Sequence, residues 1–169
     1  MNSQDSIDQL SQALVAELLK AGKSLATAES CTGGSIAKSI TDNPGSSACF
    51  GYGIVCYSNG AKELLLGVSP VTLQEQGSVS EQVVIEMAEG CLNLSGADYA
   101  VAVSGIAGPD GGTEQKPVGT VWICWATRGS GKSSITSEMH TLAGDRHQIR
   151  AQTVIIAMQG VRERLRAGD

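Results

Sequence analysis

Serine and lysine side chains that could act as a nucleophile and its base follow one another in the first part of the chain. Ser47 lies in a Gly-Ser-Ser turn, and Lys62 follows after a segment rich in strand-forming residues. A neutral lysine can take the proton of a serine hydroxyl when burial or a neighbouring cation lowers the lysine pKa. The hydroxyl of Tyr57, between the two, is suited to relay that proton or to hold the lysine. Taken singly, each residue also fits an ordinary role in a turn, a strand or an exposed helix.

Other common catalytic groups are scarce. Only His140 and His147 are present, which leaves few candidates for a Ser-His-Asp triad and disfavours a zinc site of the usual spacing. The five cysteines are odd in number and include no Cys-x-x-Cys pair, a pattern typical of reduced thiols in the cytoplasm. We therefore expect a cytoplasmic protein whose chemistry uses neither a metal nor a cofactor.

A glycine pair follows the first predicted strand, in the segment 28–34. Ser30 and Thr32 precede Gly33 and Gly34, and a helix is expected to begin there. Backbone N–H groups at such a helix start can bind a phosphate or a carboxylate. The same residues also fit a tight strand-to-helix turn capped by serine and threonine, so the glycine pair alone is a weak indication of a site.

A longer glycine-rich loop covers residues 104–112, directly after the most apolar predicted strand. It begins with Ser104 and contains Gly105 and Gly108. Because glycine loses more backbone entropy on folding than other residues, a loop of this kind is disfavoured unless special geometry is needed. We expect a substrate-binding loop; an ordinary surface excursion is the alternative.

Two arginines, Arg146 and Arg150, stand four residues apart at the predicted start of the last helix. Positive charges there oppose the helix dipole, and an anion shared with the helix N-terminus would relieve the conflict. Alternatively, Asp145 caps the helix and both arginines are solvated.

The segment 129–133, Gly-Ser-Gly-Lys-Ser, looks like the end of a phosphate-binding P-loop. The full pattern requires glycine at position 126, where this chain has Ala126, and it requires a helix afterwards. Residues 134–141 instead alternate like a strand. We interpret the segment as the turn of a β-hairpin.

Apolar periodicity and turn residues indicate the elements that must position these groups. Helices are predicted at 6–21, 33–40, 61–66, 71–76, 81–94 and 145–166. Strands are predicted at 24–29, 50–57, 99–104, 118–127 and 134–141. This order predicts an α/β protein with three α/β/α layers, in which helices cover both faces of a mixed sheet and a C-terminal β-hairpin precedes the last helix.

Length and composition indicate one globular domain over residues 1–169. Hydrophobic residues make up 41% of the chain, but the longest apolar runs are too short to cross a bilayer, and no secretory signal is visible. The 17 acidic residues against 12 basic ones give a net charge of −5, which argues against broad nucleic-acid binding. We expect neither a membrane nor a nucleic acid as a partner.

Several motifs, in order along nearly the whole chain, resemble those of the CinA C-terminal domain family. They are TAESCTGG at 27–34, YSN at 57–59, SGIAGPDGG at 104–112, KPVGTV at 116–121 and GDR at 144–146. Full-length CinA proteins carry an additional N-terminal domain, for which 169 residues leave no room, so the resemblance implies the stand-alone form. It also implies hydrolysis of the carboxamide of nicotinamide mononucleotide to nicotinate mononucleotide and ammonia, in pyridine-nucleotide recycling.

The resemblance also implies a Ser–Lys dyad with an assisting tyrosine. Carried over by motif, these roles fall on Ser47, Lys62 and Tyr57. Ser104 is expected as a further polar group at the glycine-rich loop, and Ser30 is a second candidate for the nucleophile.

Substrate binding is expected from the glycine-rich segments and from two helix starts, at Thr32, Gly33, Gly34, Asn59, Gly105, Gly108 and Arg146. The chain departs from the family at Gly60, where glutamate is expected in close relatives, and this change could loosen the approach to Lys62. We expect the partner to be a small nucleotide substrate and the assembly to be a homo-oligomer, a dimer. The alternatives are a nucleotide-binding regulatory module without catalysis and an inactive remnant that only binds nucleotide; ammonia release distinguishes both from an enzyme.

Overall fold

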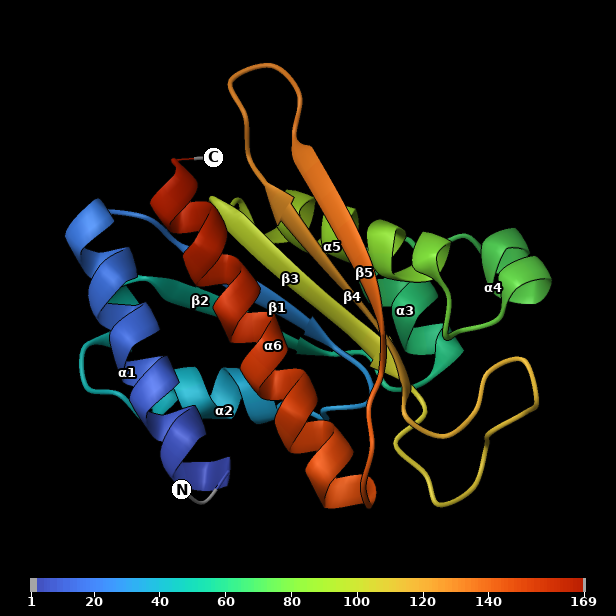
Figure 1. The fold of residues 1–169 in the computed structure, drawn as a ribbon. Helices are drawn as coiled ribbons and strands as arrows, with labels where there is room; N and C mark the ends of the chain where they lie inside the picture. Colours follow the sequence, from blue (N-terminus) through green and yellow to red (C-terminus); the bar gives the residue numbers. More distant parts are fainter. Residues whose placement is uncertain (1–2, 169) are drawn as a thin grey trace.

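A five-stranded mixed sheet forms the centre of the structure, a computed structural model in which residues 3–168 are described (Figure 1). The strands lie in the order β2-β1-β3-β4-β5. Their bounds are β1 (Leu25–Glu29), β2 (Phe50–Val55), β3 (Tyr99–Gly105), β4 (Thr120–Thr127) and β5 (Ser134–Thr141). β1 pairs in parallel with β2 and β3, whereas β4 pairs antiparallel with β3 and β5. The predicted mixed sheet and C-terminal hairpin are confirmed.

Helices cover both faces of this sheet (Figure 1). One face carries α1 (Ser3–Ala21), α2 (Ser35–Thr41) and α6 (Arg146–Ala167); the other side carries α3 (Asn59–Leu66), α4 (Pro70–Gln76) and α5 (Glu81–Ser95). Successive strand residues point to opposite faces, so β3 contributes Val101 and Val103 to one core and Ala100 and Ala102 to the other. The predicted three-layer α/β/α architecture is confirmed.

The carboxyl ends of the three parallel strands lie at the same end of the sheet. We call this end the carboxyl edge; it is formed by the ends of the strands and is not an outer strand of the sheet. Glu29, Val55 and Gly105 end β1, β2 and β3 there. β4 begins and β5 ends at the same edge, since Thr120 pairs with Thr141, and α6 starts just beyond. Open α/β sheets place their ligands at such an edge, in the loops that follow the strands.

Two predicted boundaries shift because glycines adopt left-handed backbone conformations. The helix predicted from residue 33 begins at Ser35, since Gly33 and Gly34 have φ angles of +61° and +91°. The strand predicted from residue 118 begins at Thr120, after Gly119 with φ of +94°. Within residues 3–168, no helix is long and apolar enough to cross a membrane.

Candidate active site

Lys62 is a buried lysine at the carboxyl edge, with only 1% of its surface exposed. Its Nζ donates hydrogen bonds to Oγ of Ser30 at 3.1 Å, to the carbonyl oxygen of Cys56 at 3.0 Å and to that of Tyr57 at 3.3 Å. Burial lowers the pKa of the Lys62 amine below its usual 10.5. A buried amine with a lowered pKa, in contact with a serine hydroxyl, has the chemistry of a base beside a nucleophile.

The start of α3 positions this lysine. Ser58 caps the helix by accepting a hydrogen bond from the N–H of Ala61 at 3.1 Å, so the chain turns back directly after β2. Lys62 lies in the first turns of the helix and reaches the residue that follows β1. A Cβ at Gly60 would meet no atom within 4 Å. Position 60 therefore has room for a side chain, and the expected loosening around Lys62 stays a prediction.

Ser30 opens the turn between β1 and α2. Its N–H donates to the carbonyl oxygen of Val103 at 3.0 Å, and its own carbonyl oxygen accepts from the N–H of Gly33 at 3.0 Å. Ser30 is therefore held from the β3 side and from within its own turn, and it is 8% exposed. The structure thus brings the second candidate nucleophile, and not the first, into contact with Lys62.

Ser47 lies elsewhere. It belongs to a short 3-10 helix, Ser46–Ala48, that precedes β2, and its side chain is exposed. Lys62 follows β2, so the whole strand of six residues separates the two, which corresponds to about 20 Å at the usual rise per residue. The predicted Ser47–Lys62 pair is not formed, because the serine and the lysine stand at opposite ends of the same strand.

Tyr57, Arg146 and the glycine-rich loop meet beside the Ser30–Lys62 pair. Arg146 donates from Nη2 to the hydroxyl of Tyr57 at 3.1 Å and from Nη1 to the carbonyl oxygen of Gly108 at 2.7 Å. The Tyr57 hydroxyl therefore binds Arg146, and the contact of Tyr57 with Lys62 is made by its carbonyl oxygen instead. These residues border a cavity of about 250 Å³, lined by Cys31, Tyr57, Ser78, Val79, Gly105, Ile106, Ala107, Gly108, Asp110, Gly111 and Arg146. Ser30 and Lys62 are not among these lining residues; we call it the active-site cavity because Cys31 directly follows Ser30 and the carbonyl oxygen of Tyr57 binds Lys62.

Two further predicted site residues have other contacts. Ser104 is buried, and its Oγ donates to the carbonyl oxygen of Ser78 at 2.7 Å, which ties the end of β3 to the segment before α5. Asn59 is the exposed first residue of α3. Ser104 thus supports a wall of the cavity, while Asn59 has no contact that links it to Ser30 or Lys62.

One N–H of the predicted phosphate cradle at 32–34 and its threonine hydroxyl are used within the protein. The N–H of Gly33 is taken by the carbonyl oxygen of Ser30, and the buried Thr32 donates its hydroxyl to Glu29 at 2.6 Å. The structure therefore favours the alternative, a tight strand-to-helix turn, and the turn serves to hold Ser30.

Asp145 caps the start of α6, as the alternative interpretation of this segment predicts. Asp145 accepts a hydrogen bond from the N–H of Gln148 at 2.9 Å, and the side chain of Gln148 accepts from the Asp145 N–H at 2.8 Å. The two arginines that follow are nevertheless engaged rather than solvated. Arg146 lines the active-site cavity, and Arg150 contacts the turn after β1.

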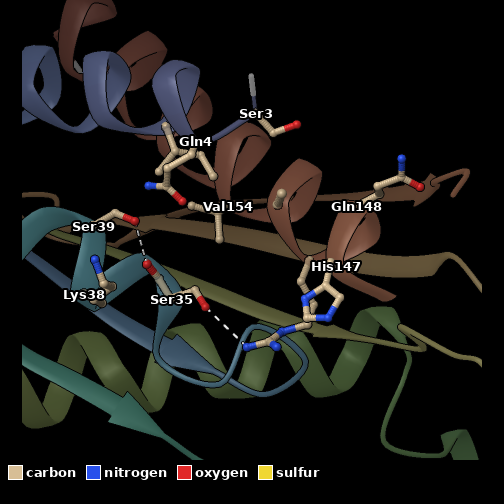
Figure 2. A pocket seen from close by; sticks show the side chains of 11 residues that line it. Ser3, Gln4, Ser35, Lys38, Ser39, His147, Gln148 and Val154 are labelled. Carbon is tan, nitrogen blue, oxygen red and sulfur yellow. Dashed lines mark hydrogen bonds between the residues drawn. The ribbon is translucent and has the colours of Figure 1, made fainter. Parts of the chain in front are cut away.

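Figure 2 shows a second cavity, of about 390 Å³, on the face covered by α1, α2 and α6. Ser35 of α2 and His147 of α6 lie across it from one another. Arg150 also lines this cavity, and its Nη2 donates to the carbonyl oxygen of Thr32 at 2.8 Å and to Oγ of Ser35 at 3.3 Å. Arg146 and Arg150 therefore act at different places, and Arg150 braces the turn that carries Ser30.

The segment 129–133 connects β4 and β5 and is followed by a strand, as the hairpin interpretation predicted. Because β4 starts at the carboxyl edge, this turn lies at the opposite edge, far from Lys62 and Ser30. The strand that follows, where a P-loop requires a helix, rules out the P-loop alternative.

Every cysteine of the chain is a buried free thiol. Cys31, next to Ser30, borders the active-site cavity, and burial raises the pKa of its thiol to about 12. A thiol with so high a pKa is protonated near neutral pH and is a poor nucleophile. Among residues 3–168, no cluster of three or more His, Cys, Asp or Glu side chains is arranged to hold a metal ion.

Glu29 is a residue of the site that the sequence reasoning missed. It is the only charged residue of strand β1 and is fully buried, directly before Ser30. The sequence does contain one indication of its importance, a glutamate within a predicted buried strand. Acidic side chains are almost never fully buried without partners.

The described chain matches proteins that share both its length and its fold. The family model of the CinA C-terminal domain matches residues 7–165. Among curated relatives, the chain is 52% identical over 152 residues to "Nicotinamide-nucleotide amidohydrolase PncC" of Escherichia coli K12, with 89% of this chain and 90% of the relative covered. It is 50% identical over 157 residues to the protein of the same name from Pseudomonas putida, with 93% and 96% covered.

Solved structures show the same fold. The competence/damage inducible protein CihA from Agrobacterium tumefaciens superposes with a TM-score of 0.90 at 39% identity, with 94% of each chain covered. A CinA superfamily protein from Klebsiella pneumoniae superposes with a TM-score of 0.89 at 38% identity, with 99% of each chain covered. The match of the family model over nearly all of its residues, together with these relatives, shows that the chain belongs to the CinA C-terminal domain family.

Proposed function

We propose that this protein is an amidohydrolase that deamidates nicotinamide mononucleotide to nicotinate mononucleotide and ammonia, in pyridine-nucleotide recycling. The observation that carries the proposal is the contact of 3.1 Å between the buried Nζ of Lys62 and Oγ of Ser30. Relatives about 50% identical to the chain bear the name of nicotinamide-nucleotide amidohydrolase, and the chain covers nearly their whole length.

In the first half of the reaction, Ser30 is the nucleophile and Lys62 is its base. Neutral Lys62 takes the proton of the Ser30 hydroxyl as Oγ attacks the carbonyl carbon of the carboxamide. The tetrahedral intermediate collapses when the C–N bond breaks, and the protonated Lys62 gives its proton to the leaving nitrogen, which departs as ammonia. The product is an ester between Ser30 and the nicotinoyl group.

In the second half, water replaces ammonia. Lys62, again neutral, takes a proton from a water molecule as its oxygen attacks the ester carbonyl. The bond to Ser30 Oγ breaks, the lysine returns the proton to Oγ, and nicotinate mononucleotide leaves. Backbone N–H groups around the cavity, in the turn after Ser30 or in the glycine-rich loop, are the candidates to stabilise the oxyanion in both halves.

The nucleotide would lie in the cavity bordered by Tyr57, Gly108 and Arg146. The substrate carries a phosphate, and Arg146 is a cation on the wall of this cavity in a chain of net charge −5. Tyr57 is exposed there and offers an aromatic face to a positively charged pyridinium ring. Arg146 therefore replaces the turn at 32–34 as the leading candidate for the phosphate contact.

A cytoplasmic homodimer without nucleic-acid or membrane partners belongs to the same proposal. β2 is an edge strand of the sheet, and it leaves Tyr52 and Val55 exposed. Apolar side chains on an unpaired sheet edge are typical of a surface that another chain covers. Light scattering on the purified protein measures the oligomeric state, and a monomer at all concentrations would contradict this part.

The test of the function is the product balance. Purified protein is incubated with nicotinamide mononucleotide, and ammonia and nicotinate mononucleotide are quantified together. An amidohydrolase forms both in equal amounts. A protein that binds the nucleotide but releases no ammonia would instead support the alternative, a regulatory module without catalysis.

A further inference from the structure

Glu29 combines complete burial with a position directly before Ser30. It is the last residue of β1, and 0% of it is exposed. A carboxylate removed from water is costly unless hydrogen bonds replace its hydration. The partners of Glu29 therefore show what its burial accomplishes.

The two carboxylate oxygens accept four hydrogen bonds in a symmetric arrangement. Oε1 accepts from the N–H of Ala37 at 2.8 Å and from the hydroxyl of Thr27 at 3.3 Å. Oε2 accepts from the N–H of Ile36 at 3.0 Å and from the hydroxyl of Thr32 at 2.6 Å. Each oxygen thus binds one backbone N–H of α2 and one threonine hydroxyl.

These partners enclose the turn that carries Ser30. Thr32 lies two residues after Ser30, and the N–H groups of Ile36 and Ala37 belong to the first turn of α2, where the turn ends. Gly34, at the start of α2, has no side chain to cap the helix, and the carboxylate of Glu29 takes that role from the end of β1. One side chain therefore holds the middle of the turn and the helix that follows it.

We propose that Glu29 is a positioning residue that holds the turn 30–34 so that Ser30 Oγ remains in contact with Lys62. This inference rests on the proposed function, because it assigns Glu29 a part in turnover through Ser30. Glu29 does not touch the reacting atoms; it acts through Thr32 and through the start of α2.

Glu29→Gln tests the proposal with the smallest change of shape. An amide has one oxygen and one NH₂ group, and only the oxygen accepts hydrogen bonds. Threonine hydroxyls can rotate and accept a hydrogen bond, but a backbone N–H cannot. In either orientation of the amide, one N–H of Ile36 or Ala37 faces an NH₂ group, so the turn must shift.

The measurement is kcat and KM for nicotinamide mononucleotide, together with the pH profile and the melting temperature. We expect kcat of Glu29→Gln to fall roughly 10- to 100-fold, as for a displacement of about 1 Å in a catalytic group, with KM little changed. The midpoint of the acid limb of the pH profile should stay at its wild-type value, because the burial of Lys62 is unaltered.

Asp98→Asn is the matched control. Asp98 is a carboxylate at the opposite edge of the sheet that accepts from the N–H of Ser24 at 2.9 Å, from its hydroxyl at 2.8 Å and from Lys23 at 3.1 Å. Asp98→Asn, like Glu29→Gln, replaces a hydrogen-bonded carboxylate by an amide and should lower stability, but it leaves the turn 30–34 untouched. We expect a lower melting temperature with kcat close to that of the wild type.

The outcomes separate the possibilities. Wild-type kcat in Glu29→Gln, or equal loss of kcat in Glu29→Gln and Asp98→Asn at equal loss of melting temperature, would overturn the inference.

If Glu29→Gln does not fold, Thr32→Val is measured instead. This variant removes one hydrogen-bond partner of Glu29 and keeps the carboxylate. A reduced kcat with unchanged KM supports the proposal, and unchanged kcat overturns it. Absence of ammonia release by the wild type would overturn the proposed function as well, whereas the other failures concern Glu29 alone.

Discussion

At the scale of single residues, the site depends on how burial lowers the pKa of one lysine side chain, that of Lys62. Lys62 lies on the first turns of a short helix, where a lysine is usually solvated. Here its amine is buried against Ser30 and two backbone carbonyl oxygens, and burial lowers its pKa. The lowered pKa raises the fraction of neutral amine near neutral pH, and only the neutral amine can act as a base.

The role of Lys62 predicts a pH dependence with a defined sign. Turnover should rise with pH as the amine loses its proton, with a midpoint below the usual 10.5 because the pKa of Lys62 is lowered. Lys62→Ala should lose nearly all turnover, and Lys62→Arg should not restore it, because arginine stays charged at these pH values. Rates of ammonia release between pH 6 and 10 provide the measurement. Substantial turnover by Lys62→Arg would show that the base is another group.

The two serines show which part of the site could be predicted from sequence. Lys62 and the pair of glycine-rich loops were identified by residue type and motif, and the structure places Lys62 and the longer loop at one edge. Ser47 precedes β2 and Ser30 follows β1, and only strand direction decides which of them meets a residue that follows β2. Sequence motifs do not reveal strand direction, so they could not decide between the two serines. They also do not show that Glu29 binds the start of α2.

At the scale of elements, α3 is held against α5 by a close approach of the backbones. Gly90 of α5 lies so near the end of α3 that a Cβ would be 1.9 Å from the carbonyl oxygen of Leu66. Because α3 also carries Lys62, the packing of these two helices sets the position of the base. The hydrophobic periodicity of α5 predicts a buried side that includes Leu94; its other members are buried, but Leu94 is exposed. The close approach at Gly90 depends on the neighbouring helix and could not be inferred.

Gly90→Ala should therefore destabilise the protein although alanine favours helices. Alanine is better than glycine in a helix by about 1 kcal/mol, but overpacking in a filled core typically costs about 1–3 kcal/mol. Because the Cβ would meet backbone atoms, the cost lies at the upper end of this range, and we expect the free energy of unfolding in urea to fall by about 2 kcal/mol after the gain in helix propensity. Gly60→Ala on α3 is the control, since its Cβ would meet no atom within 4 Å. A Gly90→Ala variant as stable as Gly60→Ala would show that α3 and α5 are farther apart than in this structure.

At the scale of the whole molecule, the first and last helices are joined by charge. Glu17 of α1 accepts hydrogen bonds from Arg162 of α6 at 2.6 and 3.0 Å and from Arg166 at 2.7 Å. The hydrogen bond with Arg162 is the main cause that lowers the pKa of Glu17, from its usual 4.5 to about 2. These contacts close the layer of helices over one face of the sheet.

This ion-paired carboxylate predicts a loss of stability in acid. The folded-state pKa of Glu17 is lower than its unfolded value, so its contribution is complete above pH 4.5 and is lost as the pH falls toward 2. Because the pair is partly exposed and screened by solvent, we expect Glu17→Gln to reduce the free energy of unfolding at neutral pH by about 1 kcal/mol. Urea titrations from pH 7 to 2 should show the variant converging with the wild type at the acid end. Glu163→Gln, an exposed glutamate on α6, is the control, and an equal effect there would contradict a specific role for Glu17.

The order of strands and helices along the chain predicted the layers, because alternation of the two elements leaves few arrangements. Periodicity alone could not give the parallel pairing of β1 with both β2 and β3. That pairing is what brings the ends of β1 and β2 together and creates the site. The activity of this molecule therefore depends on the pairing of Ser30 with Lys62 that this sheet creates.

The most direct test of that claim is the rate of ammonia release from nicotinamide mononucleotide by Ser30→Ala and Ser47→Ala, measured beside the wild type. Binding of the nucleotide to each variant is measured in parallel, to show that the fold and the cavity are intact. We predict that Ser30→Ala binds the nucleotide but loses turnover by about a thousandfold or more, while Ser47→Ala turns over at close to the wild-type rate. Loss of turnover in Ser47→Ala with activity retained in Ser30→Ala would contradict it.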